Sequence, residues 1–261
     1  MQNLIFVVMH KPYKTPNISP YKSIAVGPNK NNFVTVYKDN KGEDNIANKN
    51  ASYCELTAHY WIWKNVAKKY KNIGLNHYRR YLGNSEFQRL KILKDKNISK
   101  YLKKYDIILP KPWYWKMSVA EKYYIDGLGK KKDLETARNA IKKYYPTYLN
   151  SFDSVLDRHY ASYCNMFITN RERFMEYSEW LFKILDYVEL NTDISNYTPE
   201  EKRVYGYLSE LLLNVWVDKN NLKIKYLPMI QKELPFKYKI KTSIKFFLLK
   251  NFYQKFRLNK G

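Results

Sequence analysis

The chain has 261 residues, of which 45% are hydrophobic and 27% are charged. These proportions are typical of a globular protein with one packed core, and they exclude a disordered or fibrous chain. Lysine and arginine outnumber aspartate and glutamate by 47 to 24, which gives a formal net charge of +23 and indicates an anionic partner: a phosphorylated small molecule, a phospholipid surface or a nucleic acid. An AT-rich genome, which favours lysine, tyrosine and asparagine codons, explains the same excess, so the charge alone does not choose among them.

The cysteines and the N-terminal apolar run indicate a cytoplasmic protein. Cys54 and Cys164 form no CxxC motif and no paired framework, which suits a reducing cytosol. The apolar run at residues 4–9 is too short for a signal peptide or a membrane span. It predicts instead a first strand that is covered on both faces.

The elements that follow alternate between strand and helix patterns. Short strands are predicted at residues 24–26 and 33–37, a polar loop at 38–50, and a helix at about 52–70 that opens with a capping-box spacing. Further strands are predicted at 73–75, 105–109, 163–169 and 223–227, and helices across 118–156 (broken near 127–129 and at 146), 171–190 and 198–217. This alternation predicts one α/β domain over residues 1–235, with a mostly parallel central sheet flanked by helices.

Residues 236–261 differ from the rest of the chain. They hold eight lysines and arginines and no acidic residue, with apolar residues at helical spacing. This composition predicts a basic amphipathic C-terminal segment. Such a segment either packs on the domain with a solvated lysine face or docks on an anionic membrane surface.

The densest group of chemically active side chains is His77-Tyr78-Arg79-Arg80-Tyr81. It follows a predicted strand, and ligands of α/β sheets bind at the carboxyl ends of strands. Adjacent arginines on an extended chain point to opposite sides. One of the two is therefore expected to bind a diphosphate with its planar fork, and the other to pair with a carboxylate. The alternative is a purely structural cluster.

Two further groups are candidates for binding or catalysis. Asp44, Asn45, Asn48 and Lys49 precede the first long helix, where they either bind a nucleotide or sugar near a helix N-terminus or serve only the loop and the helix cap. In the late helix, Arg203, Tyr207 and Glu210 share one face. Glu210 is there either a general base or an ordinary solvated or ion-paired glutamate.

Several familiar signatures are absent from the sequence. There is no glycine-rich dinucleotide or phosphate-binding loop, no HExxH, no GxSxG and no cluster of metal-spaced Cys and His residues. An Asp-x-Asp, through which many nucleotide-sugar enzymes hold a metal and a diphosphate, is also absent. A requirement for Mg²⁺ or Mn²⁺ stays open, and cationic side chains are expected to compensate diphosphate charge in place of a metal.

Read together, the motifs resemble a bacterial family long described as a domain of unknown function and found among capsule, exopolysaccharide and O-antigen genes. The resemblance covers most of the chain up to about residue 235. It is carried by these motifs in order: His10-Lys11-Pro12-Tyr13, Gly42-Glu43-Asp44-Asn45-Ile46, Asn48-Lys49-Asn50, Tyr53-Cys54-Glu55-Leu56-Thr57, Tyr60-Trp61-Ile62-Trp63-Lys64-Asn65, Gly74-Leu75-Asn76-His77-Tyr78-Arg79-Arg80-Tyr81, Tyr163-Cys164-Asn165-Met166-Phe167-Ile168 and residues 203–210.

The resemblance implies a glycosyltransferase with a GT-A-like fold, and members of the family include O-antigen galactofuranosyltransferases that use UDP-galactofuranose. The implied partners are a nucleotide-sugar donor, a lipid-linked saccharide acceptor and the inner face of the bacterial plasma membrane. The competing class is a basic, non-enzymatic nucleic-acid-binding protein, but nucleic-acid binders keep charge and aromatic residues in a stripe, whereas here they gather at predicted strand ends. No nucleic-acid partner is therefore expected.

Glycosyl transfer requires stabilisation of the departing nucleotide diphosphate and, where configuration inverts, a base for the acceptor hydroxyl. We expect Glu210 to be the base of an inverting transfer. Stabilisation of the leaving group is assigned to His77 and to Arg79 or Arg80. Donor binding is assigned to His10, Lys11, Asp44, Asn45, Asn48, Lys49, Tyr78, Asn165 and Arg203, of which Asn165 resembles the asparagine that other GT-A enzymes carry into the donor or acceptor pocket.

Overall fold

The computed structural model describes residues 2–84, 91–231 and 248–251. The predicted basic segment at 236–261 lies outside these ranges apart from four residues, so it stays a prediction, and so does the domain boundary at 235. Within the described ranges, none of the helices combines the length and the apolar character that crossing a membrane requires.

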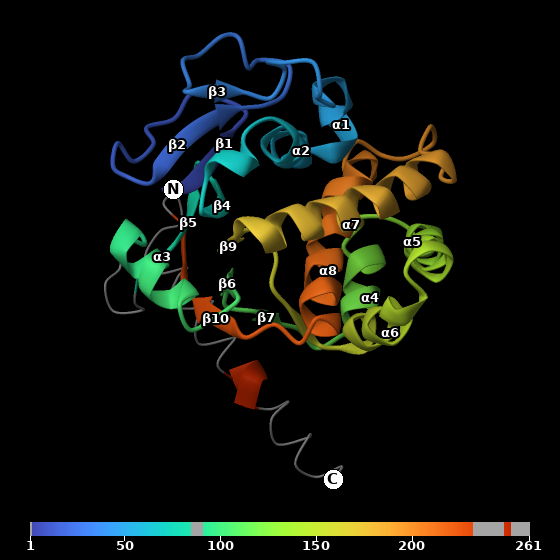
Figure 1. Cartoon of the computed structure of the whole chain (residues 1–261). Coiled ribbons are helices and arrows are strands. Elements are labelled where there is room, and N and C mark those ends of the chain that lie inside the picture. The colour runs from blue at the N-terminus through green and yellow to red at the C-terminus, as the bar shows by residue number, and fades with distance from the viewer. Residues whose placement is uncertain (1, 85–90, 232–247, 252–261) are drawn as a thin grey trace.

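A nine-stranded sheet forms the centre of the molecule (Figure 1). Its strands are β1 (Asn3–Met9), β2 (Tyr21–Ala25), β3 (Tyr37–Lys38), β4 (Asn72–His77), β5 (Arg80–Leu82), β6 (Ile107–Pro110), β9 (Phe167–Asn170), β10 (Ile224–Leu227) and β11 (Met229–Gln231). They follow the order β10-β6-β9-β4-β1-β2-β3, and β5 pairs with both β4 and β11. A separate two-stranded ribbon is formed by β7 (Trp113–Tyr114) and β8 (Tyr160–Ala161).

The strand directions confirm the predicted mostly parallel sheet. β3, β2, β1 and β4 pair in parallel, and so do β6 and β10. β9 lies between β4 and β6 and is antiparallel to both, while β5 is antiparallel to β4 and to β11. All strands of the sheet except β5 and β9 therefore run in one direction, and their carboxyl ends meet at one edge.

The helices cover both faces of the sheet. They are α1 (Asn50–Tyr53), α2 (Leu56–Asn65), α3 (Asp95–Leu102), α4 (Val119–Ile125), α5 (Lys131–Tyr144), α6 (Leu149–Asp157), α7 (Arg171–Leu190) and α8 (Val204–Lys219). α3 packs against β1, β6 and β9, whereas α7 packs against α2, β4 and β9. Figure 1 shows α3 on the opposite side of the sheet from the group α4 to α8.

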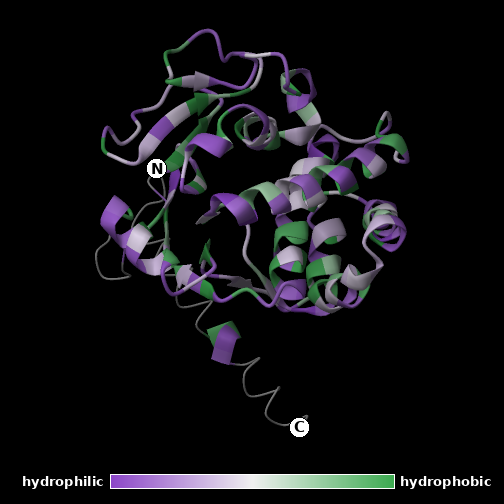
Figure 2. Cartoon of the chain, in the orientation of Figure 1, coloured by the Kyte–Doolittle hydropathy of each residue, from purple (hydrophilic) through white to green (hydrophobic). Residues whose placement is uncertain are grey.

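The core lies between the sheet and these helices. Every residue of β1 after Asn3 is buried, which accounts for its unbroken apolar sequence. α8 is apolar on nearly all sides because α1, α5, α6 and α7 all contact it. Figure 2 shows hydrophobic residues concentrated on the central strands and on the inner surfaces of the helices.

Two predicted elements differ from the structure at their starts. The capping box at residues 52–55 is wrong: α1 begins at Asn50, and the chain turns at Cys54, where φ is 52°. The strand predicted at 163–169 begins only at Phe167, because Cys164 and Asn165 adopt positive φ. A turn-forming backbone overrides the local pattern at both places.

The other two differences are shorter elements. Of the strand predicted at 33–37, only Tyr37 pairs, as the first residue of β3. The late helix was predicted from residue 198, but Thr198 and Glu201 exchange capping bonds of 2.9 and 3.2 Å ahead of a 3₁₀ turn at Glu201–Arg203, and α8 starts at Val204. The cap is present, but the turn that it closes is the tighter form.

Candidate active site

The site lies where β1 and β4 end. Val8 pairs with His77 in the parallel register of these two strands, so His10 and the His77-Tyr78-Arg79-Arg80 run leave the sheet side by side. The turn at Cys164 and Asn165 comes to the same edge, because β9 is antiparallel to β4 and begins there. Ligands of α/β sheets bind at this edge.

Tyr78 joins the ends of the two strands. Its hydroxyl lies 3.4 Å from His10 Nε2, and the two rings pack edge to face with centroids 5.2 Å apart. The guanidinium of Arg79 lies over the same Tyr78 ring, 5.0 Å from its centre. The buried tyrosine therefore holds a histidine and an arginine at one place on the surface.

Cationic side chains from three segments converge on His10. The ring is open to solvent on one side, but packing against Tyr78 removes water from the other, and this desolvation lowers its pKa. The positive charges of Lys11, Arg79 and Arg203 lower the same pKa further. A neutral histidine surrounded by cations is a favourable site for an anion.

His77 is fixed by a bond to the neighbouring turn. Its Nε2 lies 2.6 Å from the carbonyl oxygen of Cys164. Since a carbonyl oxygen only accepts, Nε2 carries the proton. His77 is therefore oriented by the backbone of the segment that leads into β9.

The backbone around the site is strained. Cys54, Cys164 and Asn165 have φ of 52°, 76° and 47°, values that side chains other than glycine rarely adopt. Such residues tend to gather at functional sites, because the surrounding structure must hold them in place. Here all three lie between the N-terminus of α2, the start of β9 and α8.

Asn165 connects these three segments. Its Nδ2 donates to Glu55 Oε1 at 2.8 Å and to the carbonyl oxygen of Gly206 at 3.0 Å. A Cβ at Gly206 would lie 3.3 Å from Cys54 Cβ and Sγ, so glycine allows the Cys54-Glu55 turn to pack closely against α8. Glu55 is thereby held beside α8.

Glu210 lies one helical turn after Gly206 and close to Glu55. Desolvation raises the pKa of Glu210 to about 8, and the negative charge of Glu55 adds to this rise. Hydrogen bonding with the Cys164 backbone and the charges of Arg80 and Arg203 act in the opposite direction. The two carboxyl groups thus share one pocket in which ionisation of Glu210 is opposed.

Arg203 connects the carboxyl groups with the cationic cluster. Its Nε donates to Cys54 Sγ at 3.3 Å, and its guanidinium lies 5.0 Å from the centre of the Tyr207 ring. Its charge also acts on both His10 and Glu210. The two adjacent arginines act on different groups: the charge of Arg79 lowers the pKa of His10, and the charge of Arg80 lowers the pKa of Glu210.

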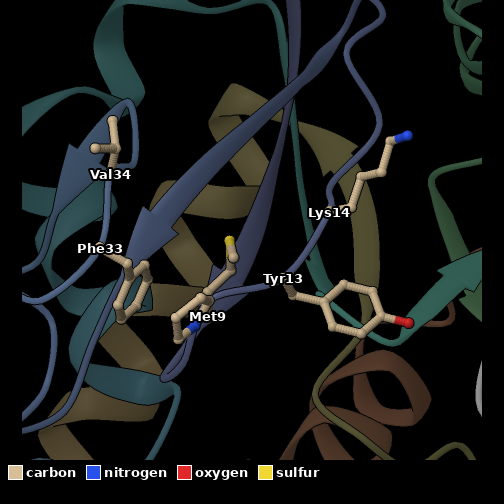
Figure 3. Close-up of a pocket in the computed structure, with 6 residues that line it drawn as sticks. Met9, Tyr13, Lys14, Phe33 and Val34 are labelled. Atoms are coloured by element: carbon tan, nitrogen blue, oxygen red, sulfur yellow. The ribbon is translucent and has the colours of Figure 1, made fainter.

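A cavity of about 450 Å³ opens beside the cationic cluster. Figure 3 shows Met9 and Phe33 next to each other in its wall, with Tyr13 and Lys14 on the segment that follows β1. Tyr13 also packs edge to face on Tyr78, with ring centroids 5.2 Å apart. The cavity therefore has an apolar, partly aromatic wall with Lys14 in its lining, and Tyr13 connects it to the Tyr78 cluster.

The polar loop before α1 does not reach this site. Asp44 accepts a hydrogen bond of 2.8 Å from Tyr60 on α2, and Asn45 bonds its own loop at Gly42 and Ala47. These contacts, and a bond from Asn65 to the Asp44 carbonyl oxygen, belong to the loop and to the middle and C-terminal end of α2. Lys49 pairs with Glu189 at the end of α7 at 2.6 Å, and Asn48 is exposed.

The structure thus brings together most of the predicted site residues and separates the rest. Those gathered at the strand ends are His10, Lys11, His77, Tyr78, Arg79, Arg80, Asn165, Arg203 and Glu210; those apart are Asp44, Asn45, Asn48 and Lys49. Glu55 was missed, because its spacing from Ser52 was interpreted as a helix cap. Within residues 2–84, 91–231 and 248–251, no three His, Cys, Asp or Glu side chains are grouped so as to hold a metal ion.

The fold is similar to that of a solved glycosyltransferase structure. The apo structure of the WbbM bifunctional glycosyltransferase matches with a TM-score of 0.80 and 31% sequence identity over 90% of this chain and 46% of that chain. The chain therefore spans about half the length of WbbM. The mannosyltransferase Ktr4p from S. cerevisiae matches with a TM-score of 0.33 and 14% identity over 79% of this chain and 59% of that one, a similarity too low to carry an argument.

No curated protein matches the sequence. Residues 4–221 match the family model described as Domain of unknown function (DUF4422), and this match confirms the family resemblance that the motifs indicate. The chain belongs to the DUF4422 family.

Proposed function

We propose that the protein is a glycosyltransferase that moves a sugar from a nucleotide-sugar donor to a saccharide acceptor. The observation that carries this proposal is the meeting of two opposite kinds of group at one sheet edge. Cations gather around His10, and the carboxyl pair of Glu55 and Glu210 lies next to them. An inverting glycosyl transfer requires both an anion-binding site for the leaving diphosphate and a base for the acceptor hydroxyl.

The donor nucleotide is proposed to bind in the cavity next to the cationic cluster. Its base is proposed to pack on Met9 and Phe33, where the wall is apolar and aromatic. Its diphosphate is proposed to bind Arg79 and Lys11, with His10 as a neutral hydrogen-bonding partner. In this arrangement side-chain cations offset the charge that develops on the leaving group.

The sugar and the acceptor hydroxyl then lie toward α8. Glu210 is proposed to accept the hydroxyl proton in an inverting transfer. Its raised pKa makes the carboxylate a stronger base than an exposed glutamate. Asn165 and Arg203 hold the groups around it, the first through Glu55 and the second through Cys54.

The similarity to WbbM, which is described as a bifunctional glycosyltransferase, supports transferase activity. The family resemblance of the motifs further supports UDP-galactofuranose as donor, a lipid-linked acceptor of capsule, exopolysaccharide or O-antigen assembly, and action at the inner membrane face. These finer assignments belong to the proposal.

A panel of nucleotide sugars tests it. Thermal shift identifies a donor because a ligand that binds only the folded state stabilises it by about 2.7 kcal/mol at 100 times its Kd. Slow release of nucleotide, measured without acceptor, then shows donor chemistry. We expect one nucleotide sugar both to stabilise the wild-type protein and to release its nucleotide. Arg79→Ala is expected to reduce both the stabilisation and the release. A panel in which no nucleotide sugar binds or is hydrolysed contradicts it.

A further inference from the structure

A second cavity, of about 330 Å³, lies outside the proposed donor site. Its walls come from α8, from the end of α6, from β8 of the two-stranded ribbon, and from the edge strand β10 and its neighbour β6. None of the groups assigned to donor binding or proton transfer lines it. It is nevertheless connected to Glu210 through α8.

The cavity follows the same face of α8 as Glu210. Asn214 and Asp218 line it, and they are four and eight residues beyond Glu210, a spacing that keeps side chains on one helical face. At a rise of 1.5 Å per residue, they lie roughly 6 to 12 Å along the helix from Glu210. Asn221, just after the end of α8, also lines the cavity.

The opposite wall is continuous with the turn that holds His77. Asn214 bonds the backbone of Ser162 in both directions at 2.9 Å, and it donates to the Glu210 carbonyl at 2.7 Å. Arg158, four residues before Ser162, forms an ion pair with Asp218 on α8. The segment from 158 to 164 therefore runs along α8 from the cavity to the catalytic carboxyl pocket.

The lining holds two aromatic rings among aliphatic and polar side chains and carries no net charge. Tyr160 and Tyr226 line the cavity, and the ring of Tyr114 lies 5.3 Å from that of Tyr160 at an angle of 30°. The lining charges, Arg158 and Asp218, neutralise each other. Aromatic faces next to a few hydroxyl, amide and paired charged groups suit a ligand with apolar C–H faces and many hydroxyls.

We infer that this cavity binds an uncharged sugar residue, and that this residue belongs to the acceptor, next to the sugar whose hydroxyl reaches Glu210. The second part rests on the proposed function. The first part does not, because it follows from the lining of the cavity alone. The donor and the acceptor then approach the carboxyl pair from opposite sides, which keeps the acceptor hydroxyl and the diphosphate apart.

Saturation-transfer NMR tests the binding. The probes are the methyl glycosides of galactose, glucose and mannose, each at millimolar concentration with the full-length protein. Transfer to at least one glycoside is expected in wild type. Tyr160→Ala and Tyr226→Ala each remove one ring from the lining, so each is expected to weaken binding by about threefold to tenfold.

Matched controls separate a binding role from a structural one. Tyr226→Phe keeps the ring and is expected to bind as wild type does. Tyr144→Ala removes a partly exposed tyrosine on α5, remote from the cavity, and leaves binding unchanged. UDP is expected not to displace the glycoside, because the proposed donor site lies at His10.

The outcomes distinguish this inference from the proposed function. Equal binding by wild type and both alanine variants, displacement by UDP, or no glycoside binding to wild type overturns the cavity assignment, whatever the donor assays show. Glycoside binding that is lost in the alanine variants supports the cavity even if no nucleotide sugar is hydrolysed. Donor hydrolysis without acceptor is expected to be unchanged in Tyr160→Ala and Tyr226→Ala, and its loss counts against an acceptor role.

Discussion

Replacing Glu210 by glutamine separates the chemical role of this carboxyl group from its structural cost. The pKa of Glu210 is raised from 4.5 to about 8 in the folded protein, so the ionised form is less stable in the native state than in the unfolded chain. The stabilisation that the protonated form provides is complete below about pH 4.5 and is lost as the pH rises to about 8. Glutamine keeps the shape of the protonated carboxyl and does not titrate.

The expected difference is large enough to measure. Each pH unit within this window changes the free energy of unfolding by at most about 1.4 kcal/mol, and partial exposure of Glu210 reduces that figure. Between pH 6 and pH 8, the stability advantage of Glu210→Gln over wild type is expected to grow by roughly 1 to 2 kcal/mol. Urea denaturation at pH 5, 6, 7, 8 and 9 measures it. Glu200→Gln, an exposed carboxyl of the preceding segment, is the control and is expected to track wild type.

The same variant is expected to lose transfer while it keeps the donor. Removing the base lowers turnover by roughly 10²-fold or more. In wild type, kcat/KM is expected to rise with pH up to about 8 and then level, since the free enzyme must ionise Glu210 before it accepts a proton. Parallel stability curves for wild type and Glu210→Gln refute the raised pKa, and near-normal turnover of the variant removes Glu210 from the mechanism.

Three further predictions concern the donor site, the packing of the turn and the tail. Arg79→Lys keeps the charge but loses the bidentate fork, so kcat/KM is expected to fall by about tenfold or more while activity persists in EDTA; abolition by EDTA with rescue by Mn²⁺ contradicts the cationic mechanism. Gly206→Ala places a Cβ 3.3 Å from Cys54, and denaturation is expected to show a loss of about 1 to 3 kcal/mol together with reduced donor hydrolysis; a variant with normal stability and activity shows that the contact yields freely. Truncation after Pro235 removes eight basic residues, each contributing roughly 1 kcal/mol near an anionic surface, so binding to anionic vesicles is expected to fall and binding to neutral vesicles to stay unchanged; equal binding by both forms rules out the membrane role.

Elements with a strong local signal were predictable from the sequence. The apolar run after Asn3 is the central strand β1, and the amphipathic helix predicted at 171–190 is α7 with the same bounds. The polar run from His77 to Arg80 lies at the predicted strand end. In each case the signal lies within one continuous segment, so the local order of apolar and polar residues is enough to predict the element.

The features that depend on distant segments were not predictable. Glu55 lies beside Glu210 only because Cys54 adopts positive φ and Gly206 leaves room for the turn, and neither condition is visible in local spacing. The antiparallel direction of β9 likewise places the turn at Asn165 at the active edge instead of the far one. The cavity on α8 combines Tyr160 with residues from three other segments. Tertiary packing therefore decided these positions.

A crystal structure of the protein with UDP locates the donor site. We expect the uracil ring to lie against Met9 and Phe33, and the diphosphate to lie within hydrogen-bonding distance of His10 and Arg79 at the carboxyl ends of β1 and β4. Weaker UDP binding by Arg79→Ala in calorimetry accompanies that result. UDP bound in the α8 cavity, or away from the strand ends altogether, contradicts it.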